Sequence, residues 1–245
     1  MKIQNNRIFG RIHRLGLAAL LTTGLASQAQ TYLWEGHTDV GVAFEDGEWD
    51  LHVGQHEADP PMEYEPGEVV LGVDIVAAQQ TVPSVSEFSF LGAPGSSVWI
   101  LPQAHQSGLL FLGFGAEELE EGAFVNDQVT LSLQAVRGTG LFSVYTVDMF
   151  GSPSVLMDSG DGITGADAIS LSAGAHQHVN WAFSTPGLYE VDFEATGTLT
   201  DGNVFTSSGL VTYTFDVAAV PEPGTLALVA LGSLGLLWRG RRNHH

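Results

Sequence analysis

The sequence predicts an all-β fold, an antiparallel β-sandwich of the immunoglobulin-like kind with little helix. Short runs of Val, Leu, Ile, Phe and Tyr alternate with polar residues along most of the chain. Turn-forming residues separate these runs, with 30 Gly and 10 Pro among 245 residues. Alternation with a period of two is typical of strands that bury one face, and many such strands favour a sandwich.

The first two strands are expected at residues 40–44 and 49–53, because an Asp-Gly pair at 46–47 between alternating runs predicts a hairpin. Later strands are expected at residues 69–76, 98–101, 109–112, 129–136, 141–145, 188–196 and 204–217.

Two connections and one helix complete this prediction. Residues 141–145 are expected to pair with 129–136 across Gly138-Thr139-Gly140, and the last two strands are joined through Asp201-Gly202. Residues 116–121 are the helical candidate, about one and a half turns long.

Residues 1–29 have the pattern of a cleavable secretory signal peptide, which predicts export through the Sec machinery. Four basic residues precede the apolar run 15–25, and Ser27-Gln28-Ala29 supplies small residues for cleavage. The apolar run is too short to cross a bilayer.

The C-terminal segment 220–245 has three parts. Val220, Pro221, Glu222 and Pro223 break regular structure, and the uncharged apolar run 225–238 follows. A basic cluster ends it, formed by Arg239, Arg241 and Arg242. The run is shorter than the roughly 20 residues of a comfortable membrane span, which favours a temporary stop in the inner membrane.

The order of these parts resembles the PEP-CTERM sorting signal. The resemblance implies that an exosortase-type transpeptidase in the inner membrane of a Gram-negative bacterium removes the tail. It also implies a cell-surface or extracellular-matrix location, with exopolysaccharide as a neighbour. A plain single-pass transmembrane helix is the alternative.

Charge excludes one class of partner for residues 30–219. This segment holds one basic residue, Arg137, and 27 of the 28 acidic residues. Nucleic-acid binding requires Lys and Arg, so no nucleic-acid partner is expected, whereas cations would be attracted. Without cysteine, the domain is expected to be stable without disulfides.

The landmarks of residues 30–219 resemble those of the choice-of-anchor M domain, also described as an actinobacterial surface-anchored domain. The resemblance rests on motifs at residues 36–39, 90–92, 98–102, 149–151, 158–162, 176–183, 186–189 and 213–217. It implies anchors that differ between lineages, and it associates the domain with metal-type ABC transporters. It implies no enzymatic activity.

Two pairs of residues predict a metal site. His176 and His178 are two apart on an expected strand, as are His37 and Asp39, so each pair shares one face. Two such strands side by side would supply four ligands to a divalent cation, with Zn²⁺ as the expected ion. Asn180 would orient one ligand, while Val179, Trp181 and Phe183 point into the core. The alternative is that the histidines bind backbone groups and hold loops together.

Other candidate chemistry is weaker. His52 and His56 share a face if their strand continues past Gly54, and the aspartates at 158–167 form a calcium loop or a turn. Of the four tryptophans that could form a carbohydrate-stacking platform, Trp99 and Trp181 are expected in the core, while Trp34 and Trp49 could lie in either place; a platform would make the domain an adhesion module, the alternative function. No nucleophile or phosphate-loop motif is present in the domain, so we expect no enzyme.

Overall fold

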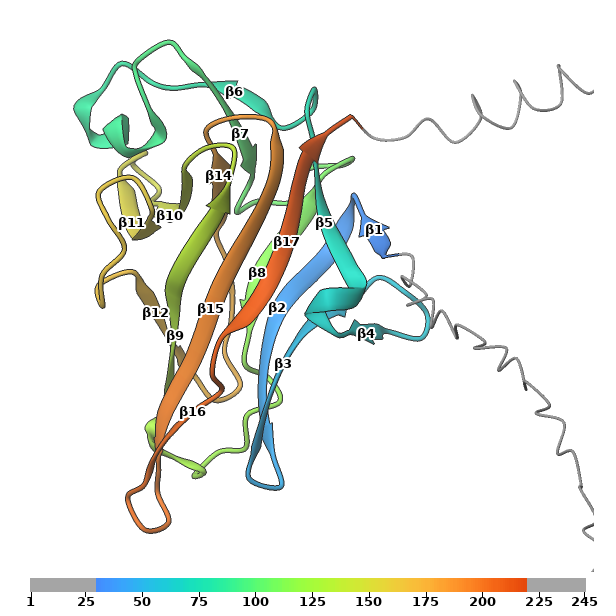
Figure 1. Ribbon diagram of the computed structural model, residues 1–245, viewed down its shortest axis with the longest axis vertical. Helices are drawn as coiled ribbons and strands as arrows, with labels where there is room; N and C mark the ends of the chain where they lie inside the picture. Colours follow the sequence, from blue (N-terminus) through green and yellow to red (C-terminus); the bar gives the residue numbers. More distant parts are fainter. Residues whose placement is uncertain (1–29, 220–245) are drawn as a thin grey trace, which may run out of the picture.

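A computed structural model describes residues 30–219, which form three β-sheets (Figure 1). The largest sheet has the strand order β1 (Thr31–Leu33), β5 (Val69–Asp74), β17 (Val211–Ala218), β15 (Gly187–Leu199), β9 (Phe124–Gly138) and β12 (Ala168–Ser172), with β16 (Phe205–Ser207) on β15. The predicted all-β sandwich is confirmed. Neighbouring strands are mostly antiparallel, but β5 pairs in parallel with both β1 and β17.

Two five-stranded sheets form the opposing side of the sandwich. One, the β14 sheet, has the order β11 (Pro153–Asp158), β10 (Phe142–Val147), β14 (Asn180–Phe183), β7 (Ser97–Leu101) and β6 (Gln79–Thr81). The other, the β8 sheet, has the order β13 (His176–His178), β8 (Leu110–Gly115), β2 (Gly36–Glu45), β3 (Glu48–Gln55) and β4 (Met62–Tyr64).

The core lies where all three sheets meet. Phe193 of β15 contacts Phe114 of the β8 sheet and Trp181 of the β14 sheet, with ring centroids 6.1 and 6.2 Å apart. Phe215 of β17 stacks near Trp181 at 5.7 Å. These aromatic side chains are fully buried, so they account for much of the hydrophobic stabilisation.

Helix is limited to two short 3₁₀ turns in the described residues, η1 (Pro66–Glu68) and η2 (Ser86–Leu91). The predicted helix at residues 116–121 is wrong. The backbone of Ala116 pairs with the loop after β12, donating to Ala175 and accepting from Gly174, which commits it to sheet-like contacts. No helix in residues 30–219 is long and apolar enough to span a membrane.

The predicted pairing of residues 141–145 with 129–136 is also wrong. β9 pairs with β15 and β12, whereas β10 lies in the β14 sheet between β11 and β14. The glycines of the connection serve close packing, because a Cβ at Gly138 would touch Tyr189 and one at Gly140 would collide with Thr185. The chain therefore passes from one layer to the other here.

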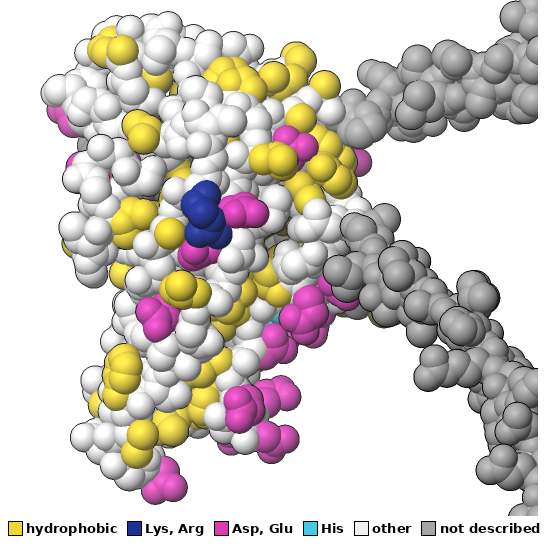
Figure 2. Space-filling model, viewed as in Figure 1, with side chains coloured by type: hydrophobic (Ala, Val, Ile, Leu, Met, Phe, Trp, Pro, Cys, Tyr) yellow, Lys and Arg dark blue, Asp and Glu magenta, His cyan; other side chains and the backbone are white. Residues whose placement is uncertain are grey.

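The surface is acidic, with one positive side chain in the region drawn in colour (Figure 2). Arg137 donates to Glu190 at 3.0 Å and through Nη2 to Asp192 Oδ1 at 2.8 Å. Hydrogen bonding to Arg137 lowers the pKa of Asp192 below its ordinary value. This basic residue is thus already paired within its own sheet.

Candidate metal centre

The two predicted ligand pairs face the same side of the β8 sheet. His37 and Asp39 lie on β2, and His176 and His178 lie on β13. The expectation that these two strands are neighbours is wrong, because β8 runs between them, parallel to β2 and antiparallel to β13. The four side chains meet above β8.

Glycine in β8 makes this meeting possible. Gly113 is the register partner of both Asp39 on β2 and His178 on β13. A Cβ on Gly113 would collide with Asp39 Oδ1 and would lie 3.1 Å from His178 Nδ1. Any side chain at this position would therefore occupy the space in which the two ligands approach each other.

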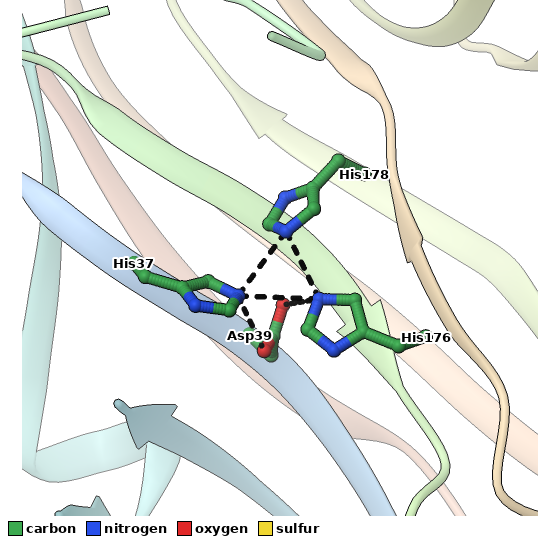
Figure 3. A group of neighbouring side chains, drawn as sticks. All are labelled: His37, Asp39, His176 and His178. Atoms are coloured by element: carbon green, nitrogen blue, oxygen red, sulfur yellow. Dashed lines mark hydrogen bonds and ion pairs between the residues drawn. The ribbon is translucent and has the colours of Figure 1, made fainter. Parts of the chain in front are cut away.

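The three imidazoles converge through their Nε2 atoms (Figure 3). The distances are 3.2 Å between His37 and His176, 2.9 Å between His176 and His178, and 3.1 Å between His178 and His37. Asp39 closes the group, with Oδ2 at 3.4 Å from His37 Nε2 and Oδ1 at 3.3 Å from His176 Nε2. One ligand atom from each of the four residues lies within 4.8 Å of the others.

The three distances between the imidazole nitrogens, and the two from Asp39 through its two oxygens, are close to the edge length of a tetrahedron around a small cation. Zn²⁺ binds imidazole nitrogen at roughly 2.0–2.1 Å, so tetrahedral ligands lie about 3.3 Å apart. The five distances above range from 2.9 to 3.4 Å. Each Nε2 carries either a proton or a lone pair, and lone pairs aimed at one point repel unless a cation lies between them.

Asp39 is a buried carboxylate at the base of the group. It is 2% exposed, and neither carboxylate oxygen accepts a hydrogen bond from residues 30–219. Burial raises its pKa, against the opposing effect of the nearby histidines. A buried carboxylate that accepts no hydrogen bond is costly, and a cation would compensate its charge.

The imidazoles of His178 and His37 are held in the neutral form that binds metals. Burial lowers the pKa of His178 to about 4, and its ring stacks on Phe111 with centroids 3.4 Å apart and planes 11° apart. Burial also lowers the pKa of His37, although Asp39 acts in the opposite direction. Near neutral pH both rings therefore offer lone pairs rather than protons.

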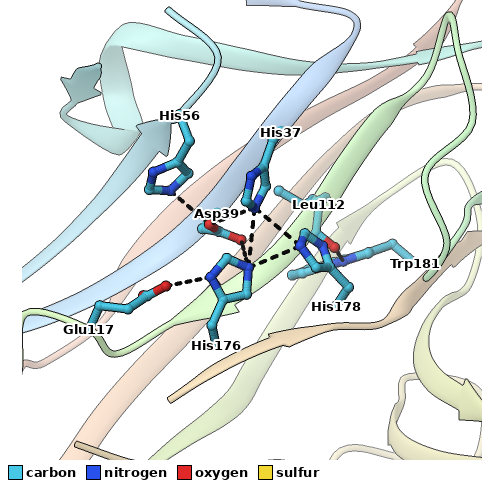
Figure 4. A network of polar contacts seen from close by, with 8 residues as sticks. All are labelled: His37, Asp39, His56, Leu112, Glu117, His176, His178 and Trp181. Atoms are coloured by element: carbon cyan, nitrogen blue, oxygen red, sulfur yellow. Dashed lines mark hydrogen bonds and ion pairs between the residues drawn. The ribbon is translucent and has the colours of Figure 1, made fainter. Parts of the chain in front are cut away.

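Two further residues contact the ligands, and neither was among the predicted ligands (Figure 4). Glu117 contacts Nδ1 of His176 through Oε1, which favours the tautomer whose Nε2 lone pair faces the cluster. His56 Nε2 lies 2.8 Å from Asp39 Oδ2. The predicted helix at residues 116–121 includes Glu117; in the structure Glu117 lies in the turn after β8, with Oε2 above Gly115.

The predicted role of Asn180 is wrong. Asn180 begins β14, in a different sheet, where it donates to Gln103 Oε1 at 2.8 Å and to the Tyr145 carbonyl at 3.3 Å. The neighbouring core predictions are confirmed, since Val179, Trp181 and Phe183 are fully buried. Trp181 donates to the Leu112 carbonyl at 3.1 Å, which fixes β14 to the strand beneath the cluster.

A cavity of about 250 Å³ opens beside Asp39 on the same face of the sheet. It is lined by Asp39, Gly41, Val42, His52, Gly54, His56, Gly115, Glu117 and Glu118. The two histidines of β3 and its continuation thus share a face, as their spacing predicted.

The aspartates at residues 158–167 form a turn. Asp167 accepts from the backbone of Asp158 at 2.8 Å and of Thr164 at 2.7 Å, and Asp158 accepts from Gly160 at 2.8 Å. Their oxygens cap backbone groups, which favours the turn over a calcium loop.

Comparison with known proteins identifies the C-terminal segment. Residues 219–242 match the PEP-CTERM protein-sorting motif. No curated protein matches the chain. The motif marks a secreted or cell-surface protein of Gram-negative bacteria that is sorted by an exosortase. The predicted signal peptide and the sorting residues from Val220 to Arg242 lie outside the described residues.

Proposed function

We propose that this protein is a non-catalytic surface protein whose β domain binds one divalent metal ion, with Zn²⁺ as the best-fitting ion. The ligands are Nε2 of His37, His176 and His178 and a carboxylate oxygen of Asp39. One observation carries the proposal: a buried carboxylate without hydrogen bonds faces three imidazole nitrogens that converge on one point.

The number of protein ligands favours binding over catalysis. Structural zinc sites have four protein ligands, whereas catalytic sites have three and leave one position for water or substrate. Here four side chains each offer one ligand atom, and these atoms lie within 4.8 Å of one another. Such a site suits storage, presentation or stabilisation rather than activation of water.

We propose that export and sorting bring this domain to the outer side of the inner membrane. We propose that residues 1–29 direct export through the Sec machinery and that an exosortase then removes the tail. We also propose that the domain is a choice-of-anchor M domain, from the order of its landmarks. The association of that family with metal ABC transporters is consistent with a protein that presents metal to an uptake system.

Metal analysis of the purified protein tests the proposal. We expect about one divalent ion per chain under native conditions, and a lower melting temperature after chelation. Ligand at a thousand times its dissociation constant stabilises a fold by about 4 kcal/mol, so the shift should be several degrees.

The matched variants are His176→Ala/His178→Ala and the control His105→Ala, an exposed histidine outside the cluster. The double variant should contain no metal and should melt at the same temperature with and without chelator. The control should behave like the wild type. If the wild type contains no metal and its melting temperature does not change with chelator, the histidines have a structural role instead.

A second candidate function is carbohydrate binding. Tyr32 and Trp34 stack with centroids 5.6 Å apart and planes 19° apart, and Tyr32 is 45% exposed. Trp34 lies over Gly72, where a Cβ would collide with its ring. An exposed tyrosine stacked on a half-buried tryptophan suits contact with sugar rings. Loss of binding to purified exopolysaccharide in Trp34→Ala, with metal content unchanged, would support this function.

A further inference from the structure

The cavity beside Asp39 carries polar groups that the proposed metal centre does not use. Its lining includes His52, His56, Glu117 and Glu118 together with Asp39. Its volume, about 250 Å³, exceeds that of a bare ion and suits a cation that retains several water molecules.

Three glycines form the floor of this cavity. Gly41 on β2 is the register partner of Gly115 on β8, and Asp39 is the partner of Gly54 on β3. Polar side chains occupy the space above these glycines: His52 Nε2 over Gly41, Glu117 Oε2 over Gly115, and His56 Nε2 over Gly54. Together with Asp39 of β2, nitrogen and oxygen donors from β3, from His56 just after it and from the turn after β8 therefore gather above neighbouring positions of one sheet.

Two buried groups in this cavity lack partners. His52 is 8% exposed, and its Nδ1 has no hydrogen-bond partner in residues 30–219; the nearest carboxylate oxygen, on Asp50, is 4.0 Å away. Asp39 Oδ2 faces the cavity beside His56 and also lacks a hydrogen bond. Buried polar atoms without partners indicate a ligand or ordered water that binds there.

The charge of the residues that line the cavity indicates whether that ligand is an anion or a cation. Three carboxylates and two imidazoles surround the space, and the one Lys or Arg of the described domain, Arg137, is paired with Asp192 in another sheet. An anionic ligand would be repelled, whereas a divalent cation would be attracted.

We propose that the cavity is a second divalent-cation site, joined to the first through the carboxylate of Asp39. Oδ1 of Asp39 lies 3.3 Å from His176 Nε2, and Oδ2 lies 3.4 Å from His37 Nε2 and 2.8 Å from His56 Nε2, so Oδ2 lies between the imidazoles of the first site and those of the cavity. His52, His56 and the cavity carboxylates supply the other protein donors, and water completes the coordination. Mixed nitrogen and oxygen donors suit Zn²⁺, Co²⁺ or Mn²⁺. This inference rests on the proposed function, since Asp39 serves both sites.

The test measures metal stoichiometry in the purified full chain after chelation and saturation with Zn²⁺ or Mn²⁺. We expect two ions per chain. The variant His52→Gln/Glu118→Gln, which changes cavity residues outside the first ligand set, should bind one. Because His52 is buried, Glu118→Gln alone serves as a second variant and should weaken the second ion about tenfold or more. Glu120→Gln, an exposed neighbour outside the cavity, is the matched control.

Electron paramagnetic resonance of the Mn²⁺-loaded protein provides a second readout. Two ions bridged by one carboxylate should give a coupled signal, and the double variant should give the signal of an isolated ion. One ion per chain at saturation in the wild type overturns the second site, and two uncoupled ions overturn its connection to the first through Asp39; both outcomes leave the first site. Absence of any bound ion overturns both.

Discussion

Gly113 and Asp39 are register partners on β8 and β2, and the carboxylate of Asp39 occupies the space above Gly113 that a side chain would need. The absence of a side chain on β8 thus allows ligands from the strands on either side to meet. A change to β8 should therefore disturb the metal centre without altering any ligand.

Gly113→Ala tests this relationship. The new methyl group would collide with Asp39 Oδ1 and press on His178, so we expect metal affinity to fall by about 10–100-fold, as for other changes that displace ligands indirectly. Isothermal titration with Zn²⁺ measures the effect. Gly165→Ala is the control, because a Cβ there meets nothing within 4 Å. Equal affinities in the two variants would contradict the role of Gly113.

The metal-free protein should lose stability as the pH falls from about 6.5 to about 4. His178 has an ordinary pKa of 6.5 when unfolded, and burial lowers it to about 4 in the fold. In that range the unfolded chain binds the proton more readily, so acidification favours unfolding. Urea unfolding of chelated protein at several pH values measures this slope. His178→Gln should flatten it, and an unchanged slope would show that other groups are responsible.

Arg137→Gln should lower the stability of the fold, because it leaves Asp192, which is 5% exposed, with Thr212 as its remaining side-chain donor. Glu190→Gln is the control and should have little effect, since that carboxylate is 55% exposed.

The effect of Arg137→Gln should depend on pH. Arg137 lowers the pKa of Asp192 in the fold, so the stabilisation is complete above the unfolded value of about 3.9 and is lost as the pH falls through the folded value. Wild type and variant should therefore converge in acid. A constant difference in unfolding free energy between pH 7 and pH 2 would contradict this explanation.

Mature protein at the cell surface should lack residues 225–242. The sorting motif matches 219–242, and an exosortase that acts at the Pro-Glu-Pro segment would remove the apolar run and the arginines. Mass spectrometry of surface protein checks this. An intact C-terminus in cells with active exosortase would instead indicate a permanent anchor.

The all-β fold and the two ligand pairs of the site could be predicted from the sequence, but the order of the strands could not. Strand alternation placed His37 with Asp39 and His176 with His178 on common faces, because side chains two apart point the same way. Alternation does not reveal which strands are neighbours, so it could not show that β8 lies between β2 and β13. Sheet order depends on packing between distant residues, such as Phe114 against Phe193.

Two predictions from local sequence patterns, the helix at residues 116–121 and the hairpin at 138–140, are wrong because contacts with distant residues determine the structure there. The turn at residues 116–121 has the composition of a helix, but Ala116 pairs with residues 174 and 175. Glycines at 138 and 140 suggested a hairpin, but they allow close packing against Tyr189 and Thr185. In both cases the partner lies more than 40 residues away, where no local pattern can show it.

The position of β17 determines how the domain would carry mechanical load. This strand ends at Ala218, directly before the sorting motif, and lies in the sheet interior between β15 and β5 (Figure 1). A pull on the chain at Ala219 acts along the strand, and the hydrogen bonds to both neighbours lie across that direction. The bonds must then shear together instead of opening one after another. A surface protein anchored through this end would therefore bear an external force on β17, a strand that can be pulled out only by breaking its hydrogen bonds to both neighbours at once.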